Sequence, residues 1–370
     1  MAMTAGIGSR RDERAREVST VGKLLQRPEL GAVAGTTLVF LFFAIVAGDK
    51  GMFSPKGILN FLDVSAQLGI IAVAAALLMI GGEFDLSVGS MIAFAGICIA
   101  IPATEWGWPI GWCILFSFAV ALAIGWINGM LVVRTGLPSF IVTLGGLFIL
   151  RGLTIGITRP LTGRTQIPGL SGPAQEDWLA PWFGGQAFTG TFAWLAEAGW
   201  IAKLPNGAAS VTGISMSILW WLLLVVLATW VLMRIRFGNW IFASGGDKHA
   251  ARNVGVPVDR VKITLFMFTA LCAAIFAACQ VMTFGSADTQ RSPLKEFEAI
   301  IAVVIGGTLL TGGYGSAVGS AFGALIFGVV QMGIFYTGVD TNWFKVFVGA
   351  MVLISVMFNN HIRKKVTESR

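Results

Sequence analysis

The sequence predicts an all-α polytopic integral membrane protein with about ten transmembrane helices. Of its 370 residues, 55% are hydrophobic and only 12% are charged, about half the charged share of an average soluble domain. The mean hydropathy is +0.78. A helix that rises about 1.5 Å per residue crosses about 30 Å of hydrocarbon with roughly 20 residues. Six stretches of this order contain no charged residue: 31–48, 64–82, 86–104, 106–133, 204–233 and 263–283.

Charged residues, Pro/Gly clusters and Asn divide the apolar stretches into ten predicted spans, of which the eighth is short. The spans form one transmembrane domain over residues 31–358, between an N-terminal segment at 1–30 and a C-terminal tail at 359–370. The predicted spans lie near 31–48, 58–80, 86–103, 109–133, 138–158, 213–233, 263–284, 297–311, 316–336 and 342–358.

The distribution of basic residues predicts the orientation in the membrane. Of the 26 Lys and Arg residues, 17 fall on one face of the predicted topology and 7 on the other, while Arg151 and Lys345 lie inside spans. Cytoplasmic loops are enriched in Lys and Arg. Both termini are therefore expected in the cytoplasm. In this setting the net charge of +7 reflects membrane orientation, and we expect no nucleic-acid partner.

The segment 159–212 is expected on the outer side and is rich in Gly, Pro and Trp. Tryptophan favours the bilayer interface over open solvent. Two arrangements explain this composition: a partly inserted or re-entrant stretch, or short helices that lie on the outer surface.

The segment 237–262 is expected on the cytoplasmic side. Asp247 can cap a short helix over 248–254, which Gly255 and Pro257 would stop. A short capped helix between two spans is suited to docking a partner. The alternative is a loop of solvated charges.

The segment 81–90 places two carboxylates, Glu83 and Asp85, between strongly apolar spans. In one interpretation, Asp85 or Ser87 caps the third span and Glu83 lies in cytoplasmic water. In the other, this segment is a broken helix end that lines the path of a polar solute.

Arg151 interrupts a span in which residues 135–150 are uncharged. Either its side chain extends to the interface, or it forms an ion pair or lines a path inside the membrane. Gln67 and Asn128 are uncharged polar groups at bilayer depth, where they can also hydrogen-bond a neighbouring helix.

Three sets of glycines spaced four residues apart predict close helix packing. They are Gly315, Gly319 and Gly323; Gly125 and Gly129; and Gly152 and Gly156.

No residue pattern indicates an enzyme or a metal site. Four cysteines fall within predicted spans without close pairs or neighbouring histidines, and His249 and His361 are isolated. The sequence has no GxxxxGK[ST] phosphate loop, HExxH motif or GxSxG motif. We therefore expect no cofactor on this chain, and any ATP must bind to another chain.

Five ordered segments resemble the permease subunit of bacterial ABC importers for monosaccharides of the ribose and xylose type. Residues 82–90 resemble that family's Gly-Gly-Ile-Asp-Leu-Ser-Val-Gly-Ser signature. Departures are Glu83, where the family commonly has a second Gly, and an outer segment that looks longer than usual. The other four segments are 125–129 with 138–145, Arg151-Gly152, 243–255, and 296–308 with 312–319.

The resemblance implies a multi-pass permease of the bacterial inner membrane that imports a monosaccharide by alternating access. It implies a second permease subunit, expected to be a copy of this chain. It also implies two cytoplasmic ATPase subunits that carry ATP and Mg²⁺, and a periplasmic sugar-binding protein. Alternatives are an ABC permease for nucleosides, branched-chain amino acids or a sugar-like signal, and a self-sufficient secondary carrier or channel.

A neutral monosaccharide is expected to pass aromatic and small polar groups rather than fixed charges. The candidate path residues are Gln67, Asp85, Ser87, Asn128, Phe140, Thr143 and Arg151. The resemblance implies that the cytoplasmic helix fits a groove on the ATPase. The candidate coupling residues are Gly246, Asp247, Lys248, Ala250, Ala251, Arg252 and Gly255.

Overall fold

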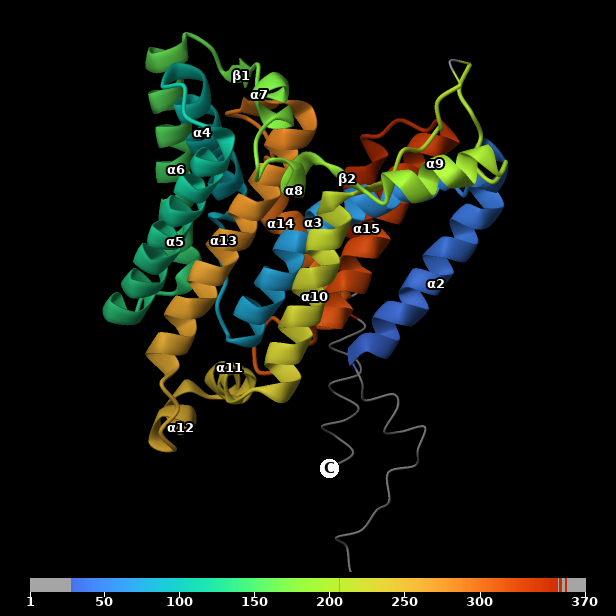
Figure 1. Ribbon diagram of the computed structural model, residues 1–370. Coiled ribbons are helices and arrows are strands. Elements are labelled where there is room, and N and C mark those ends of the chain that lie inside the picture. Colours follow the sequence, from blue (N-terminus) through green and yellow to red (C-terminus); the bar gives the residue numbers. More distant parts are fainter. Residues whose placement is uncertain (1–27, 206, 352, 355–356, 358–370) are drawn as a thin grey trace, which may run out of the picture.

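The computed structural model describes residues 28–205, 207–351, 353–354 and 357 (Figure 1). The predicted C-terminal tail at 359–370 and most of the N-terminal segment at 1–30 lie outside these residues. Within the described residues, eight helices are long and apolar enough to cross a membrane. They are α2 (Pro28–Ala47), α3 (Pro55–Ile80), α4 (Val88–Glu105), α5 (Ile110–Thr135), α6 (Ser139–Thr162), α10 (Met216–Arg234), α13 (Val258–Phe284) and α15 (Ala317–Thr337).

The polytopic helical class is confirmed, but the number of ten crossings is not. The predicted span at 297–311 is wrong: α14 (Lys295–Ile305) has only 11 residues and is about 16 Å long, too short to cross alone. It ends because Gly307 takes a left-handed backbone conformation, with φ of 89°. Of the predicted span at 342–358, residues 343–351 are helical and part of the remainder is not described.

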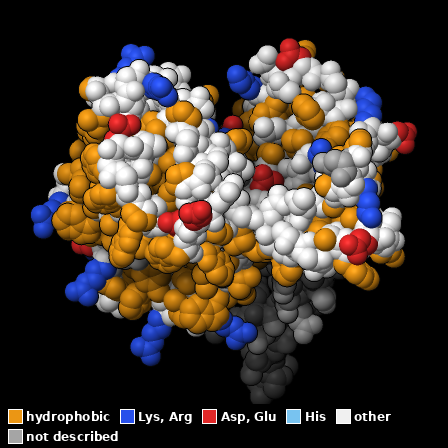
Figure 2. Space-filling model, turned by 45° about the horizontal axis from the view of Figure 1, so that its top comes forward, with side chains coloured by type: hydrophobic (Ala, Val, Ile, Leu, Met, Phe, Trp, Pro, Cys, Tyr) orange, Lys and Arg blue, Asp and Glu red, His pale blue; other side chains and the backbone are white. Residues whose placement is uncertain are grey.

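α13 and α3 form the centre of the bundle. In the most apolar window of α13, 83% of the residues are buried, compared with 22% in α6. α13 packs against α3, α4 and α5. Peripheral helices leave large apolar side chains exposed, and Figure 2 shows a broad hydrophobic surface with Lys and Arg near its edges. Such a surface is suited to contact with lipid.

Two of the three glycine sets support close helix packing. A Cβ added at Gly129 would lie 2.8 Å from the Cα of Ile263, so α5 approaches α13 closely. Gly319 and Gly323 in α15 pack in the same way against backbone atoms of Gly306 and Ala302. By contrast, Gly152 and Gly156 face open space in this chain.

Short elements cover one end of the spans, and most of them belong to the described residues of the segment 159–212. Strand β1 pairs antiparallel with β4, and β2 pairs with β3. α9 lies roughly across the direction of the spans (Figure 1). The elements on this side are η1 (Gly48–Lys50), β1 (Gln166–Pro168), α7 (Ser171–Gln175), α8 (Pro181–Gly184), β2 (Gln186–Ala187), α9 (Thr189–Glu197), β3 (Ile214–Ser215) and β4 (Ser286–Asp288).

Two short helices, α11 (Arg236–Gly246) and α12 (Lys248–Asn253), connect α10 to α13 at the opposite end of the bundle (Figure 1). The predicted cap is confirmed. The Asp247 carboxylate accepts hydrogen bonds from the backbone N–H groups of His249 and Ala250, at 2.8 and 3.0 Å. These bonds, with the Ala250 bond foremost, hold the pKa of Asp247 below its ordinary value.

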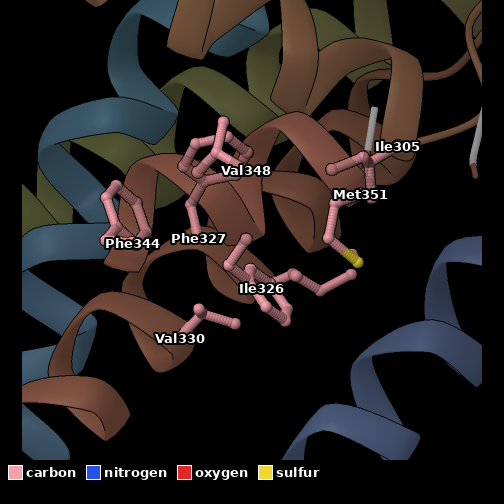
Figure 3. Close-up of a pocket in the computed structure, with 8 residues that line it drawn as sticks. Ile305, Ile326, Phe327, Val330, Phe344, Val348 and Met351 are labelled. Atoms are coloured by element: carbon pink, nitrogen blue, oxygen red, sulfur yellow. The ribbon is translucent and has the colours of Figure 1, made fainter. Parts of the chain in front are cut away.

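A small hollow near the end of the described chain is entirely apolar. Figure 3 shows Ile326, Phe327 and Val330 of α15 facing Phe344 and Val348 of the 343–351 helix. Without a polar group, it cannot orient a polar solute, and we regard it as part of the packing of these helices.

Candidate functional site

The chain leaves helical geometry between α3 and α4, over residues 81–87. Inside a membrane, irregular backbone needs internal hydrogen-bond partners. α6 supplies two of them: Ser139 Oγ accepts from the backbone N–H of Phe84, and Thr143 Oγ1 accepts from that of Leu86, both at 3.0 Å. The first turns of α6 therefore hold this interrupted segment in place.

Four predicted path residues meet at this segment. The Asp85 carboxylate accepts from the backbone N–H and hydroxyl of Ser87, and Ser87 Oγ accepts from the side-chain amide of Asn128 at 3.1 Å. Asp85, Ser87, Asn128 and Thr143 are each at least 93% buried. Because Asn128 lies seven residues before the cytoplasmic end of α5, the cluster reaches about 10 Å into the bundle.

The capping interpretation of 81–90 is wrong in both parts. Ser87 precedes α4 but makes no side-chain capping bond, and Asp85 bonds to Ser87 instead of to the first turn of α4. Glu83 is 8% exposed and pairs with Lys262 at the start of α13. The burial of Glu83 follows from a cationic partner 179 residues away in the sequence, which the local pattern did not indicate.

Gln67 lies in a separate polar network near the outer ends of α3, α10 and α13. Its amide donates to Asp63 at 3.1 Å, and its oxygen accepts from Gln280 at 3.0 Å. Asp63 also accepts from the hydroxyl of Ser217. Gln67 therefore links three helices and is apart from the cluster around Asp85.

Arg151 is exposed on α6 and lines a small chamber together with Glu296 of α14. Fixed charges of both signs therefore border this chamber. Sequence reasoning missed Glu296 as a site residue, although it stands in the fifth segment of the resemblance. A carboxylate beside a long uncharged run was the available signal.

Phe140 lies at a wide hollow of about 580 Å³, at the end of the bundle that carries α11 and α12, and is 51% exposed. Glu83, Lys262 and the start of α12, at Asp247 and Lys248, line the same hollow. The interrupted segment and the capped cytoplasmic helix thus border one space.

The predicted coupling residues differ in exposure. Ala251 is 4% exposed and packs inside the chain. The other six are exposed: Gly246, Asp247, Lys248, Ala250, Arg252 and Gly255. Val254, which the sequence analysis did not select, is 80% exposed at the end of α12. An apolar side chain this exposed on the cytoplasmic side is a further candidate for partner contact.

A joint of backbone contacts links α11 to the interrupted segment. The Gly313 N–H donates to the carbonyl oxygen of Ile80 at 2.8 Å. Gly245, near the end of α11, leaves no room for a Cβ because the Ile80 carbonyl lies against it. Gly82 takes φ of 82°, and a Cβ there would lie 3.2 Å from the Cα of Gly245. This arrangement is called the glycine joint below.

Comparisons with known proteins agree with this architecture. Residues 57–356 match the family described as branched-chain amino acid transport system / permease component. No solved structure matches the chain.

Three curated relatives are each 30% identical to this chain. They are the xylose transport system permease protein XylH of Escherichia coli K12, the fructose import permease protein FrcC of Rhizobium meliloti and the ribose import permease protein RbsC of E. coli K12. The alignments cover 90%, 88% and 87% of this chain and 92%, 84% and 91% of the relatives.

The family and the eight apolar helices assign the chain to the bacterial inner membrane. An interrupted segment held inside the bundle and a capped helix at the cytoplasmic hollow are features of a transport subunit. With a match over 300 of its 370 residues, the chain belongs to this family of transport-system permease components.

Proposed function

We propose that this chain is the permease subunit of an importer that moves a monosaccharide from periplasm to cytoplasm. The observation that carries the proposal is the cluster at the interrupted segment. Asp85, Ser87, Asn128 and Thr143 form a buried set of hydrogen-bonding groups inside the bundle, without a cation among these four side chains. Such a set matches a neutral solute rich in hydroxyls. The sugar names of the three relatives support the same substrate class.

The proposal includes separate motor and delivery proteins. A cytoplasmic ATPase pair would bind ATP and Mg²⁺ and grip α12, and a periplasmic binding protein would deliver the sugar to the outer face. A second copy of this chain would complete the path. ATP-driven closure of the ATPase pair shifts the permease between inward-open and outward-open states, because each state binds the motor differently. This chain itself catalyses no reaction.

Uptake by reconstituted liposomes tests the proposal. The permease is inserted with its ATPase and binding protein, and entry of labelled D-xylose, D-ribose and D-fructose is measured with and without ATP inside. Accumulation of one of them only with ATP is the expected result. Entry at the same rate without ATPase would instead identify a secondary carrier or channel.

The family description names branched-chain amino acids. The chamber that Arg151 and Glu296 border holds about one water molecule and has no room for the carboxylate and ammonium of an amino acid. Labelled L-leucine in the same liposomes separates the two candidates. Import of leucine but of none of the sugars would replace the monosaccharide as substrate.

Asp85→Ala should reduce uptake at least about tenfold without preventing assembly. The change leaves the buried Ser87 N–H without its acceptor, which costs about 1–3 kcal/mol and releases the segment that faces the solute. Initial uptake rates and the yield of purified complex measure the two effects. Asp85→Asn, which keeps an acceptor, serves as the control. Uptake by the Ala variant at the wild-type rate would remove Asp85 from the path.

Val254→Asp should weaken the complex with the ATPase by about tenfold or more, because a charge replaces an exposed apolar contact at the end of α12. Co-purified ATPase per permease is the measurement. Thermal unfolding of the isolated permease should stay unchanged, since the side chain contacts solvent in this chain. The control is Val226→Ala, at an apolar position of α10 that is 65% exposed. Wild-type complex yield for Val254→Asp would reject this contact.

A further inference from the structure

A small polar chamber lies between the first turn of α4, the middle of α6 and the loop that joins β4 to α14. Its free volume of about 10 Å³ holds about one water molecule. Figure 2 shows that the outer face of the molecule is hollowed, with acidic side chains in the hollow. The chamber is lined by Ser90, Arg151, Thr289, Arg291, Ser292 and Glu296, with Gly89 and Ala93.

Two hydroxyl groups in the chamber lack partners. Thr289 and Ser292 are 3% and 7% exposed, and neither hydroxyl oxygen makes a hydrogen bond in the described structure. A buried hydroxyl without a partner costs about 1–3 kcal/mol, so such groups are rare unless something else binds them. Both oxygens belong to residues that border the same free volume, and one hydroxyl or water there would be within reach of both.

The Glu296 carboxylate is fixed at one wall. It lies against Gly89, where any Cβ would overlap its oxygen. Glu296 is in the first turn of α14 and Gly89 in the first turn of α4. Burial raises the pKa of Glu296, and the positive ends of the two helix dipoles act in the opposite direction. Its carboxyl group can accept the hydrogen of a hydroxyl.

The Arg291 guanidinium is fixed near the opposite wall. It donates to the carbonyl oxygen of Ser286 at 2.8 Å and lies 4.7 Å from the ring centroid of Phe284. These contacts occupy part of its donor capacity, and its remaining N–H groups are available to an acceptor. A ligand hydroxyl needs one acceptor and one donor, and the chamber supplies both.

The loop that carries the hydroxyls is strained. Ser292 and Leu294 have φ values of 70° and 64°, which side-chain-bearing residues adopt at a cost of about 1–2 kcal/mol. Only one further non-glycine residue, Phe188, shares this conformation in the part of the chain that the structure describes. Strain of this kind persists where the surroundings fix a geometry that is used.

We propose that this chamber is a subsite of the translocation path that binds a single hydroxyl group of a neutral polyol through Thr289, Ser292, Glu296 and Arg291. Its size admits one hydroxyl group and excludes a sugar ring. The chamber therefore recognises the hydroxyl group at one position of the solute. Water fills it between substrates. The inference rests on the proposed function, and it adds a specificity determinant about one helix turn beyond the cluster at Asp85.

Thr289→Val tests the subsite because it removes the hydroxyl and keeps the shape. The first probe is the sugar that the wild-type liposomes import, out of D-xylose, D-ribose and D-fructose. The other probes are analogues of that sugar, each of which lacks one hydroxyl group. The uptake rate of every probe is divided by that of the wild-type permease. Any preference of the binding protein cancels in this ratio, because the binding protein is the same in both cases.

Thr289→Val should lower uptake of the parent sugar by about threefold to tenfold and leave uptake of one particular deoxy analogue unchanged. Thr289→Ser should behave like the wild type. Thr269→Val is the matched control: its buried hydroxyl bonds to its own helix at Leu265, away from the chamber, and its ratios should be uniform across probes.

An equal loss for the parent sugar and all analogues would overturn the subsite, because a purely structural role acts on every probe alike. Wild-type uptake of all probes by Thr289→Val would overturn it as well. Both outcomes leave the proposed function intact, since the wild-type permease still imports sugar. Failure of the wild-type permease to import any of the sugars would reject the proposed function and the subsite together.

Discussion

Lys262→Ala will lower the free energy of unfolding by about 3–5 kcal/mol, one of the two largest effects expected in this chain. The side chains of Lys262 and Glu83 are 12% and 10% exposed, so the change leaves a carboxylate buried without its cation. Thermal unfolding of the purified permease measures the loss. Uptake should fall too, since Glu83 belongs to the interrupted segment that α6 holds near the path.

The reversed pair, Glu83→Lys with Lys262→Glu, should recover much of the stability that either single change removes, because it restores one charge of each sign. A surface pair provides the control. Arg252 and Asp259 are 48% and 52% exposed, and Arg252→Ala should cost less than about 1 kcal/mol. If Lys262→Ala unfolds at the wild-type temperature, the pair does not hold the segment.

Gly245→Ala will strongly reduce the yield of folded permease and abolish uptake by the remainder. The new Cβ would overlap the Ile80 carbonyl oxygen and lie 2.7 Å from the Gly313 nitrogen. Overpacking costs about 1–3 kcal/mol where side chains can move, and here the obstacles are backbone atoms of two other segments. Separation of α3 from α11 would also disconnect α12 from the interrupted segment.

The neighbouring residue is a sharp control for this prediction. Gly246 ends α11, and a Cβ there would meet nothing within 4 Å. Gly246→Ala should leave the folded yield unchanged or raise stability by less than about 1 kcal/mol. Fluorescence-detected size exclusion measures folded yield for both variants. Equal yields from Gly245→Ala and Gly246→Ala would contradict the glycine joint.

Features set by local chemistry were predictable from the sequence. The six long charge-free stretches identify six of the eight described spans, namely α2, α3, α4, α5, α10 and α13, because hydrocarbon excludes charge over a fixed thickness. Asp247 was identified as a cap because a carboxylate that precedes a helix reaches N–H groups two and three residues later. Four of the path candidates named from the sequence lie together in the structure, but the hydrogen bonds between them were not predicted. These residues are Asp85, Ser87, Asn128 and Thr143.

Features set by distant contacts were not predictable. The segment 297–311 was expected to be a short span because it is uncharged after Glu298, whereas α14 ends at Ile305, before the left-handed Gly307. The burial of Glu83 was not predictable, because its partner Lys262 lies far along the chain and the neighbouring sequence offers no cation to pair with a buried carboxylate. Gln67 stays a predicted path residue, but its hydrogen bond to Gln280, 213 residues away, was not predictable.

The glycine joint also constrains biosynthesis. The joint consists of three backbone segments, at Ile80, Gly245 and Gly313. It therefore cannot form until more than four-fifths of the chain has been synthesised. Until then, the helices that are inserted first lie in the bilayer without the backbone contacts of the glycine joint. A product released before residue 313 would lack this contact and would expose that end of the bundle to cellular proteases.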